Sequence, residues 1–184
     1  MNSIKQYIHE LPSEDKAILD SIILERNINK KEKVNFNSNY NNKAIYVVEG
    51  ALRKYVLKDG EEKTIDFYLE DSIFFSPSLD YAPVYPFYLE SMKNSIIYVV
   101  DLNSFDKIKA EKKTLLQLEL MLTAEVSKQC HYRLETFQLL NATERYLDLI
   151  KQNSKIVKNI PLKYIASYLG INNASLSKIR ASLA

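Results

Sequence analysis

The sequence has few of the residues on which several kinds of site depend. It contains three glycines and five prolines in 184 residues, and neither a GxGxxG nor a GxxxxGK(S/T) motif occurs. This weighs against a glycine-cradled phosphate loop. The single cysteine, Cys130, excludes an intramolecular disulfide, a CxxC redox pair, a four-cysteine zinc site and an iron–sulfur cluster held within one chain. Because a lone cysteine suits a reducing compartment, we expect a cytoplasmic protein.

Long apolar runs and histidine clusters are missing too. No run approaches the ~20 residues that span a bilayer, and the first ten residues have no apolar segment of a secretory signal, so we expect no membrane partner. His9 and His131 are the only histidines, too few for a cupin-type metal site, and neither has an evident second ligand for haem. We therefore expect no metal and no cofactor.

Charge is distributed unevenly along the chain. The net charge is +2, yet residues 141–184 hold seven basic and two acidic side chains, a net of +5. The first 140 residues carry 18 basic and 21 acidic side chains, a net of −3. Such asymmetry favours a polyanionic partner such as nucleic acid for the C-terminal segment.

The N-terminal part changes from helical to strand periodicity. Residues 3–27 have apolar positions at helical spacing, interrupted at Pro12, which predicts two short helices with Ser13 as the N-cap of the second. From residue 33 to 102, short segments rich in Tyr, Val and Ile alternate with turn signals. Asp59-Gly60 is the clearest of these signals and predicts a hairpin. Many short strands at this spacing predict an antiparallel β-roll or jelly roll.

One long amphipathic helix is predicted from 114 to 140, because apolar residues recur there every three or four positions. At 1.5 Å per residue it is ~40 Å long. Either the β-domain covers its apolar stripe or the helix pairs with its copy in a homodimer, and we favour the dimer. The residues expected at that interface are Leu115, Leu118, Leu122, Val126, Cys130 and Phe137.

A boundary is predicted at Leu140/Asn141, because Asn141-Ala-Thr-Glu144 has the form of a capping box that starts a new helix. The predicted fold class is α+β. The expected parts are a β-roll sensor domain with N-terminal helices (1–113), a long dimerisation helix (114–140) and an all-α C-terminal domain (141–184).

Residues 162–181 match a helix-turn-helix at each constrained position. Ile165 and Leu169 lie one turn apart, Ala166 is small where the second helix crosses, and Gly170 suits the left-handed turn. Leu176 then gives the second helix its inward face. A generic helical hairpin explains the apolar spacing, but not the small residue, the glycine and a second helix rich in polar residues together.

The outward face of this motif suits DNA. Lysine and arginine can donate to guanine, and asparagine can bind adenine through two hydrogen bonds. A basic residue near the start of the first helix is placed to hold phosphate. The residues expected to contact DNA are Lys163, Asn172, Asn173, Ala174, Ser175, Ser177, Lys178 and Arg180.

A β-rich domain, a long helix, the capped segment Asn141-Ala-Thr-Glu-Arg145 and a C-terminal helix-turn-helix together resemble the bacterial cyclic-AMP receptor protein/FNR (Crp/Fnr) family of transcription regulators. The resemblance covers nearly the whole chain. It implies a β-roll that senses a small effector, a parallel dimer through the long helix, a palindromic operator and RNA polymerase as a further partner. The family's base-reading positions fall on Asn173, Ala174 and Lys178. Ala174 stands where the family has an acidic residue, so the family's consensus operator is not expected.

The sensor domain departs further from the family. Its cyclic-nucleotide binders carry a Gly-Glu-Leu turn and an Arg-Ser pair, where this chain has Phe75-Ser-Pro-Ser78 and Phe87-Tyr88. The resemblance places an effector pocket at Phe75, Phe87, Tyr88, Cys130 and His131. Without the arginine, we expect a small apolar effector or none, and no control by cyclic nucleotides.

Two other functions compete with a DNA-binding regulator. A protein-interaction module could use the same β-roll with a helix-turn-helix that does not bind DNA. A jelly-roll enzyme would need an acid, base, nucleophile or metal constellation. The paired carboxylates Glu61-Glu62 and Glu70-Asp71 are adjacent in sequence and would point to opposite faces of a strand, so we expect no enzyme.

Overall fold

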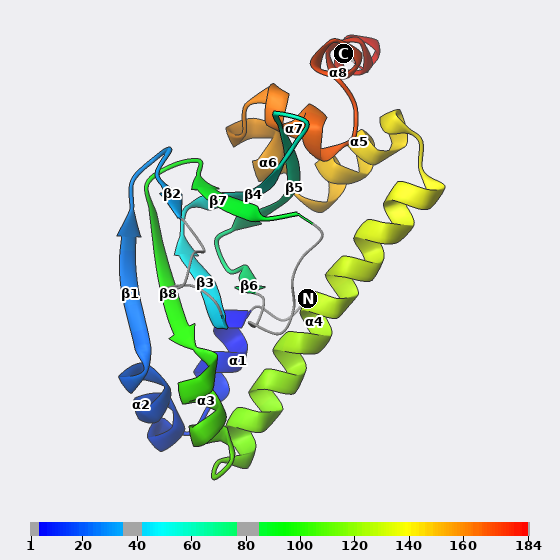
Figure 1. Ribbon diagram of the computed structural model, residues 1–184. Coiled ribbons are helices and arrows are strands. Elements are labelled where there is room, and N and C mark those ends of the chain that lie inside the picture. The colour runs from blue at the N-terminus through cyan, green and yellow to red at the C-terminus, as the bar shows by residue number, and fades with distance from the viewer. Residues whose placement is uncertain (1–3, 35–41, 77–84, 184) are drawn as a thin grey trace.

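The computed structural model describes residues 4–34, 42–76 and 85–183. Its strands make two four-stranded sheets (Figure 1), with orders β1-β8-β3-β6 and β2-β7-β4-β5, and every pairing is antiparallel. The strands are β1 (Ile23–Ile28), β2 (Lys33–Val34), β3 (Lys43–Glu49), β4 (Ala51–Lys58), β5 (Glu61–Leu69), β6 (Ile73–Phe75), β7 (Phe87–Ser91) and β8 (Ser95–Asp101). The predicted antiparallel β-roll is confirmed.

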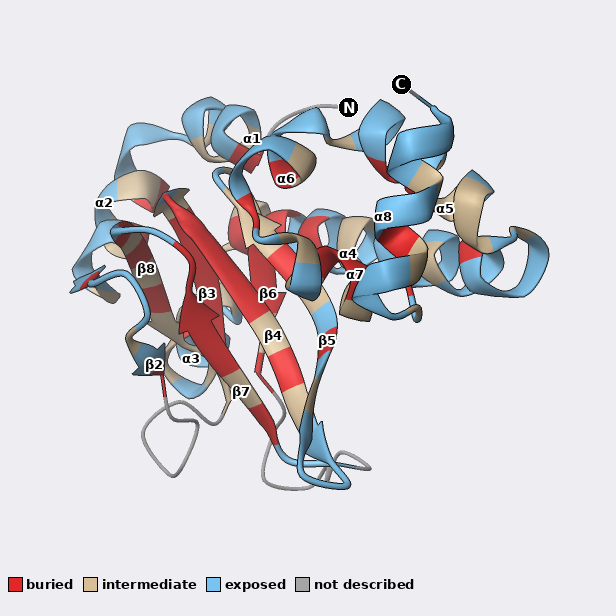
Figure 2. Ribbon diagram, turned by 90° about the horizontal axis from the view of Figure 1, so that it is seen from above, coloured by how far each residue is buried: buried red, intermediate tan, exposed pale blue. Residues whose placement is uncertain are grey.

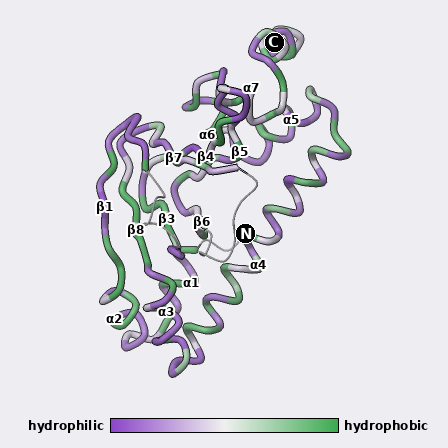
Figure 3. The backbone as a smooth tube through the Cα atoms, in the orientation of Figure 1, coloured by the Kyte–Doolittle hydropathy of each residue, from purple (hydrophilic) through white to green (hydrophobic). Residues whose placement is uncertain are grey.

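The roll is held together by one apolar core between its two sheets. Ile45, Val47 and Ile97 from the first sheet meet Leu52 and Leu89 from the second. All five are at most 2% exposed. Figure 3 shows hydrophobic residues concentrated along β3 and β8, the central strands of the first sheet.

The hairpin between β4 and β5 turns at Asp59-Gly60, as predicted. Both residues have positive φ, 54° and 79°. Two successive positive φ angles are those of the type I′ turn, whose twist matches the twist of the paired strands. The strand β5 of this hairpin contacts α7 of the C-terminal domain, while its turn lies at an exposed edge of the molecule (Figure 2).

The two predicted short helices are present as α1 (Ile4–Glu10) and α2 (Ser13–Ser21), with two corrections. The helical pattern was predicted to run to residue 27, but Ile23–Ile28 form the strand β1, which pairs with β8. Ser13 is the first residue of α2 and makes no capping hydrogen bond, because Pro12 occupies the N-cap. Asp15 in the first turn is buried and accepts a hydrogen bond from Thr114. It thereby ties α2 to the start of the long helix.

The long helix α4 (Lys113–Leu139) follows the short α3 (Leu102–Lys109) and ends within one residue of its predicted bounds. Three of its predicted dimer-interface residues, Leu115, Leu118 and Leu122, are at most 8% exposed in the single chain. They pack with residues of α1, α2, β3 and α3 in one cluster, and Val126 packs against it. The prediction was wrong for these residues, because this stripe is covered by the chain's own β-domain.

The helix breaks at Leu140, whose φ and ψ of −102° and 140° are extended. The predicted capping box then starts α5 (Ala142–Gln152): the backbone N–H of Glu144 donates to Asn141 Oδ1 at 3.1 Å, and the backbone N–H of Asn141 donates to Glu144 Oε2 at 2.8 Å. A further helix, α6 (Ser154–Asn159), was not predicted. It precedes α7 (Leu162–Tyr168) and α8 (Asn173–Ser182).

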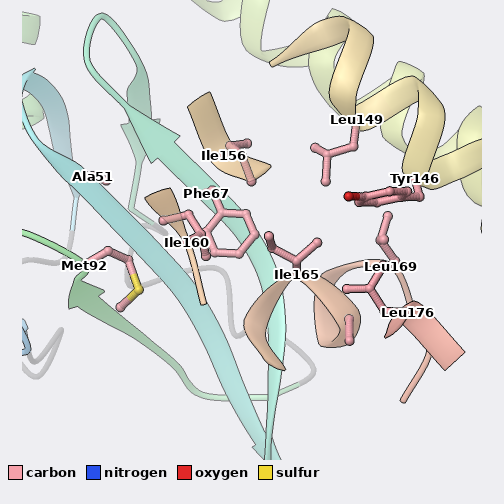
Figure 4. Close-up of a cluster of buried hydrophobic side chains, with 11 residues drawn as sticks. Ala51, Phe67, Met92, Tyr146, Leu149, Ile156, Ile160, Ile165, Leu169 and Leu176 are labelled. Carbon is pink, nitrogen blue, oxygen red and sulfur yellow. The ribbon is translucent and has the colours of Figure 1, made fainter. Parts of the chain in front are cut away.

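The C-terminal helices pack against the outer face of the second sheet. Phe67 from β5, together with Ala51 and Met92, joins one apolar cluster with Ile165 and Leu169 of the helical domain (Figure 4). Because this cluster is continuous, the position of the helical domain on the roll is fixed by burial as well as by the chain connection.

Candidate nucleic-acid interface

The turn between α7 and α8 has the geometry that the sequence predicted. Gly170 has a φ of 71°. Its N–H donates to the carbonyl of Ser167 at 3.1 Å, and the N–H of Ile171 donates to that of Ala166 at 3.0 Å. This pair of bonds is the Schellman motif. The positive φ favours glycine at this position, and a Cβ there would lie 3.2 Å from the ring of Phe137 on α4, which would have to shift slightly.

The inward faces of the two helices are buried as predicted. Ile165, Ala166 and Leu169 of α7 and its C-cap are at most 1% exposed, and Leu176 of α8 is fully buried. Leu176 therefore anchors α8 against α7, and Ile179, which is partly buried, packs against the same cluster. Figure 1 shows α8 at one end of the molecule, and Figure 2 shows that most of it is exposed.

Three of the residues expected to contact DNA have local roles at the start of α8. Asn172 is its N-cap, and its Oδ1 accepts from the backbone N–H of Ser175 at 2.8 Å. The hydroxyl of Ser177 donates to the carbonyl of Asn173 at 3.0 Å. Ser175 is only half-exposed. These groups shape the helix end and leave base contacts mainly to longer side chains.

The longer polar side chains of α8 are unpaired. Asn173, Lys178 and Arg180 are exposed, and within the part of the chain that the structure describes their side chains make no hydrogen bond or ion pair. Ala174 is exposed beside them. Lys163 is exposed on α7, with its Nζ 4.6 Å from the ring centre of Tyr164. The fold thus brings these predicted residues to one outer end of the molecule.

Two arginines that sequence reasoning missed tie the helix-turn-helix to α4 and α5. Arg145 donates to the carbonyl of Leu169 at 3.0 Å and to that of Leu140 at 2.6 Å. Arg133 of α4 donates to the carbonyl of Tyr168. Cations at the C-terminal carbonyls of a helix satisfy unpaired acceptors and complement its dipole. These hydrogen bonds hold the C-terminal end of α7 against α4 and α5, beside the break in the helix at Leu140.

A buried arginine joins α7 to the roll, and it also escaped the sequence interpretation. Arg53 of β4 is 0% exposed and donates to Glu90 Oε2 at 2.6 Å and to Glu62 Oε2 at 2.5 Å. Its guanidinium lies 4.2 Å from the ring centre of Tyr55 and 3.8 Å from that of Tyr164 on α7. Stacking of this kind orients a desolvated guanidinium.

The neighbouring strand β5 also contacts α7, through a hydrogen bond and through charge. The backbone N–H of Thr64 donates to Ser167 Oγ at 2.9 Å. Burial raises the pKa of Glu62, but its hydrogen bond to Arg53 and the charges of Arg53, Lys33 and Lys163 outweigh burial and leave that pKa lowered. Glu62 is therefore held as a carboxylate beside the helix-turn-helix.

The residues expected to line an effector pocket do not share one environment, which corrects that prediction. Phe75 lines an apolar cavity of about 70 Å³ between the first sheet and the helices α1 to α4. Phe87 is part of the core between the sheets, and Tyr88 stacks on Tyr55 at 5.3 Å between ring centres. Cys130 and His131 are exposed on α4. The segment Pro77-Ser78, which was part of the comparison with cyclic-nucleotide binders, lies outside the described residues.

The fold is that of the Crp/Fnr transcription regulators: a β-roll, a long helix and a C-terminal helix-turn-helix. FixK2 from Bradyrhizobium japonicum has a TM-score of 0.70 and 19% identity, with 88% of this chain and 84% of that chain covered. CooA from Carboxydothermus hydrogenoformans, as a double mutant, has a TM-score of 0.67 and 16% identity over 89% and 77%. A protein assigned to the crp/fnr family from Eubacterium rectale has a TM-score of 0.68 and 16% identity over 95% and 84%.

No protein-family model matches the chain, and no curated protein matches it. Among the described residues, no helix combines the length and the apolar character that crossing a membrane requires.

Proposed function

We propose that this chain is a DNA-binding transcription regulator that binds a pseudo-palindromic operator as a homodimer. The fold shared with Crp/Fnr regulators supports a regulatory role. The observation that carries the proposal is α8: a helix anchored by a buried leucine presents Asn173, Lys178 and Arg180 outward and unpaired at one end of the molecule. A helix with that surface suits the major groove.

The dimer interface is proposed on a different stripe of α4 from the one first predicted. Leu116, Leu120 and Leu134 are 41%, 62% and 56% exposed, and their spacing places them on one side of the helix. Between them the same side carries the small residues Thr123 and Ser127. Exposed leucines at this spacing favour a helix pair around a two-fold axis.

Cys130 and Phe137, which were first predicted at the dimer interface, fit the newly proposed stripe only in part. Cys130 is exposed and adjoins it. Phe137 is 41% exposed, but its ring lies 4.2 Å from the guanidinium of Arg133 and 4.9 Å from that of Arg145. Phe137 therefore packs against the two arginines that hold α7, and only its exposed part is free for a dimer contact.

We divide the chain functionally into a sensor part (1–113), a dimerisation helix (114–140) and a DNA-binding part (141–184). RNA polymerase is a proposed further partner, as for a regulator that acts at promoters. Three arginines connect α7 to the other parts of the chain: Arg53 contacts it from the roll, Arg133 from α4 and Arg145 from α5. A change in the sensor part can thereby move the helix-turn-helix.

Selection of bound duplexes from a random DNA pool tests the proposal. A two-fold dimer should enrich half-sites about one helical turn apart, ~34 Å. Enrichment of no sequence, together with no salt-dependent binding to any duplex, would instead favour a protein-interaction module.

Substitutions separate base reading from phosphate contact. Lys178→Ala should weaken specific binding by about 1 to 3 kcal/mol and relax the preference at one base pair, whereas Lys163→Ala should weaken all duplexes alike and reduce the salt slope. Lys107→Ala on α3, at the opposite end of the molecule (Figure 1), is the matched control and should change neither. Equal losses on specific and random DNA would make Lys178 a phosphate contact.

A further inference from the structure

A cleft of about 470 Å³ is lined by residues of β5, the C-terminal half of α4 and the helices α5 to α7. Asp66 and Phe67 line it from the roll, Arg133 from α4, and Leu149 and Ile156 from the DNA-binding part. Its volume is in the range of small-molecule sites, and such sites favour the junctions between domains. None of the residues first expected to line an effector pocket lines this cleft.

A cation without a carboxylate partner forms one side of the cleft. The guanidinium of Arg133 lies 3.5 Å from the ring centre of Tyr168, and it takes part in no ion pair among the described residues. Burial is the main cause that lowers its pKa. Arginine has five N–H donors, and only one of its nitrogens bonds here, to the carbonyl of Tyr168. The remaining donors suit a carboxylate.

Asp66, which also lines the cleft, is a carboxylate without a cation in contact. One oxygen of Asp66 accepts from the backbone N–H of Phe67 at 2.9 Å, and Asp66 makes no ion pair among the residues described. Burial raises the pKa of Asp66, while the charges of Arg133 and Lys54 act in the opposite direction. The opposite charges of Asp66 and Arg133 thus attract one another without contact, and a ligand between them could satisfy both.

The floor of the cleft is apolar. Phe67, Leu149, Ile156 and Leu169 line it, and Figure 4 shows these side chains in one cluster between the roll and the helices. An aliphatic or aromatic group could lie against their exposed edges.

We propose that this cleft binds an apolar α-amino acid as a zwitterion, with its carboxylate on Arg133, its ammonium group on Asp66 and its side chain on the apolar floor. The proposed dimer leaves the cleft open, because Tyr132 and Thr136, which line it, lie two residues from Leu134 and project from the opposite side of α4. The ligand would contact the roll and the DNA-binding part together. Its effect on DNA affinity rests on the proposed function; its binding does not.

Calorimetric titration of the full chain, without DNA, tests the site. L-phenylalanine and L-leucine should bind saturably, glycine should bind more weakly, and 3-phenylpropionate and phenethylamine, which each lack one charged group, should bind about tenfold more weakly than L-phenylalanine. Saturable binding of none of the twenty amino acids would overturn the proposal. Equal affinity for 3-phenylpropionate would also overturn it, since Asp66 would then have no role. These comparisons use the unaltered protein, so they do not depend on the folding of a variant.

Substitutions then locate the site. Asp66→Asn and Arg133→Lys should each weaken L-phenylalanine binding about tenfold, while Asp20→Asn at the exposed end of α2 is the control. Far-UV circular dichroism checks that each variant is folded. Binding unchanged in both folded variants would place the amino acid elsewhere and refute this cleft. If DNA binding fails while amino-acid binding holds, the proposed function is wrong and the site stands.

Discussion

Replacing Arg53 should have the largest effect on stability of the substitutions considered for this fold. Arg53 is 0% exposed and the side chain of Glu90 is 10% exposed. Its guanidinium makes hydrogen bonds to Glu90, Glu62 and Thr64. The substitution Arg53→Leu leaves Glu90 as a buried charge with no cation, and removal of one partner from a buried pair costs about 3 to 5 kcal/mol.

Two features of the structure act on this value in opposite directions. Arg53 also stacks between Tyr55 and Tyr164, and each cation–π contact contributes about 0.5 to 2 kcal/mol. Against this, Glu62 is 35% exposed and keeps Lys33 at 3.7 Å, so its carboxylate is not left unpaired. We therefore expect a loss of about 3 to 5 kcal/mol, with Glu90 as the main cause.

Urea unfolding followed by far-UV circular dichroism measures the loss, since the chain has no tryptophan. Protein concentration must be constant, because dimerisation contributes to apparent stability. The double variant Arg53→Leu/Glu90→Leu removes the stranded charge and should recover most of the loss. A loss under about 1 kcal/mol for Arg53→Leu, or a double variant no more stable than the single one, would refute this account of the buried cluster.

Three further outcomes follow from the structure. Leu120→Glu and Leu134→Glu should give folded monomers in sedimentation velocity, whereas Leu122→Glu, at 8% exposure, should lower folding stability; a dimer that survives both exposed substitutions would place the interface elsewhere. The hydrogen bond from Lys43 is the main cause that lowers the pKa of Asp101 below 3.8, so the stability from this pair is complete above about pH 4 and is lost as pH falls through that lowered pKa. Asp101→Asn should therefore flatten the decline of unfolding free energy in acid, and an unchanged acid limb in urea titrations would contradict it. Cyclic AMP and cyclic GMP should not bind in calorimetric titrations, and a dissociation constant at or below about 10 μM, about −7 kcal/mol, would show that a basic group has replaced the missing arginine.

Local signals in the sequence correctly predicted several turns and helix ends, which depend on residues close together in the chain. Asp59-Gly60 predicted the hairpin, Asn141 and Glu144 predicted the capping box, and Gly170 predicted the helix-turn-helix turn. Each rests on a backbone angle or a hydrogen bond within a few residues. One exception is Ser13, where the preceding proline takes the N-cap position instead. Another is residues 23–27, which were included in the helical pattern but lie in β1, where pairing with β8 decides the structure.

The face that α4 turns to the roll could not be predicted in this way. The helix has two apolar stripes, one with Leu115, Leu118 and Leu122 and the other with Leu116, Leu120 and Leu134. Helical periodicity shows that each stripe exists but not which one the β-domain covers. That choice is made by the partners of the first stripe, which include residues of α1, β3 and α3 far away in sequence.

The sequence of β4 likewise could not show which of its two adjacent basic residues could bind an anion. Arg53 and Lys54 are adjacent, so they point to opposite faces of the sheet, and either could have replaced the arginine that the family uses for phosphate. The roll core covers one face of β4 and α7 covers the other, so both faces are buried. The sequence of the strand therefore lacks the alternation of polar and apolar residues that would show which face Arg53 and Lys54 each occupy. The structure does distinguish them: Arg53 is neutralised by Glu62 and Glu90, while the Nζ of Lys54 lies inside the roll, 4.5 Å from the ring centre of Phe87. Burial lowers the pKa of Lys54, and a lysine lacks the two-pronged geometry with which arginine binds phosphate. An anion that enters the roll would thus meet only a weakened point charge, which is the physical reason to expect no cyclic nucleotide there, and Lys54→Met is the substitution that should abolish binding if one is found.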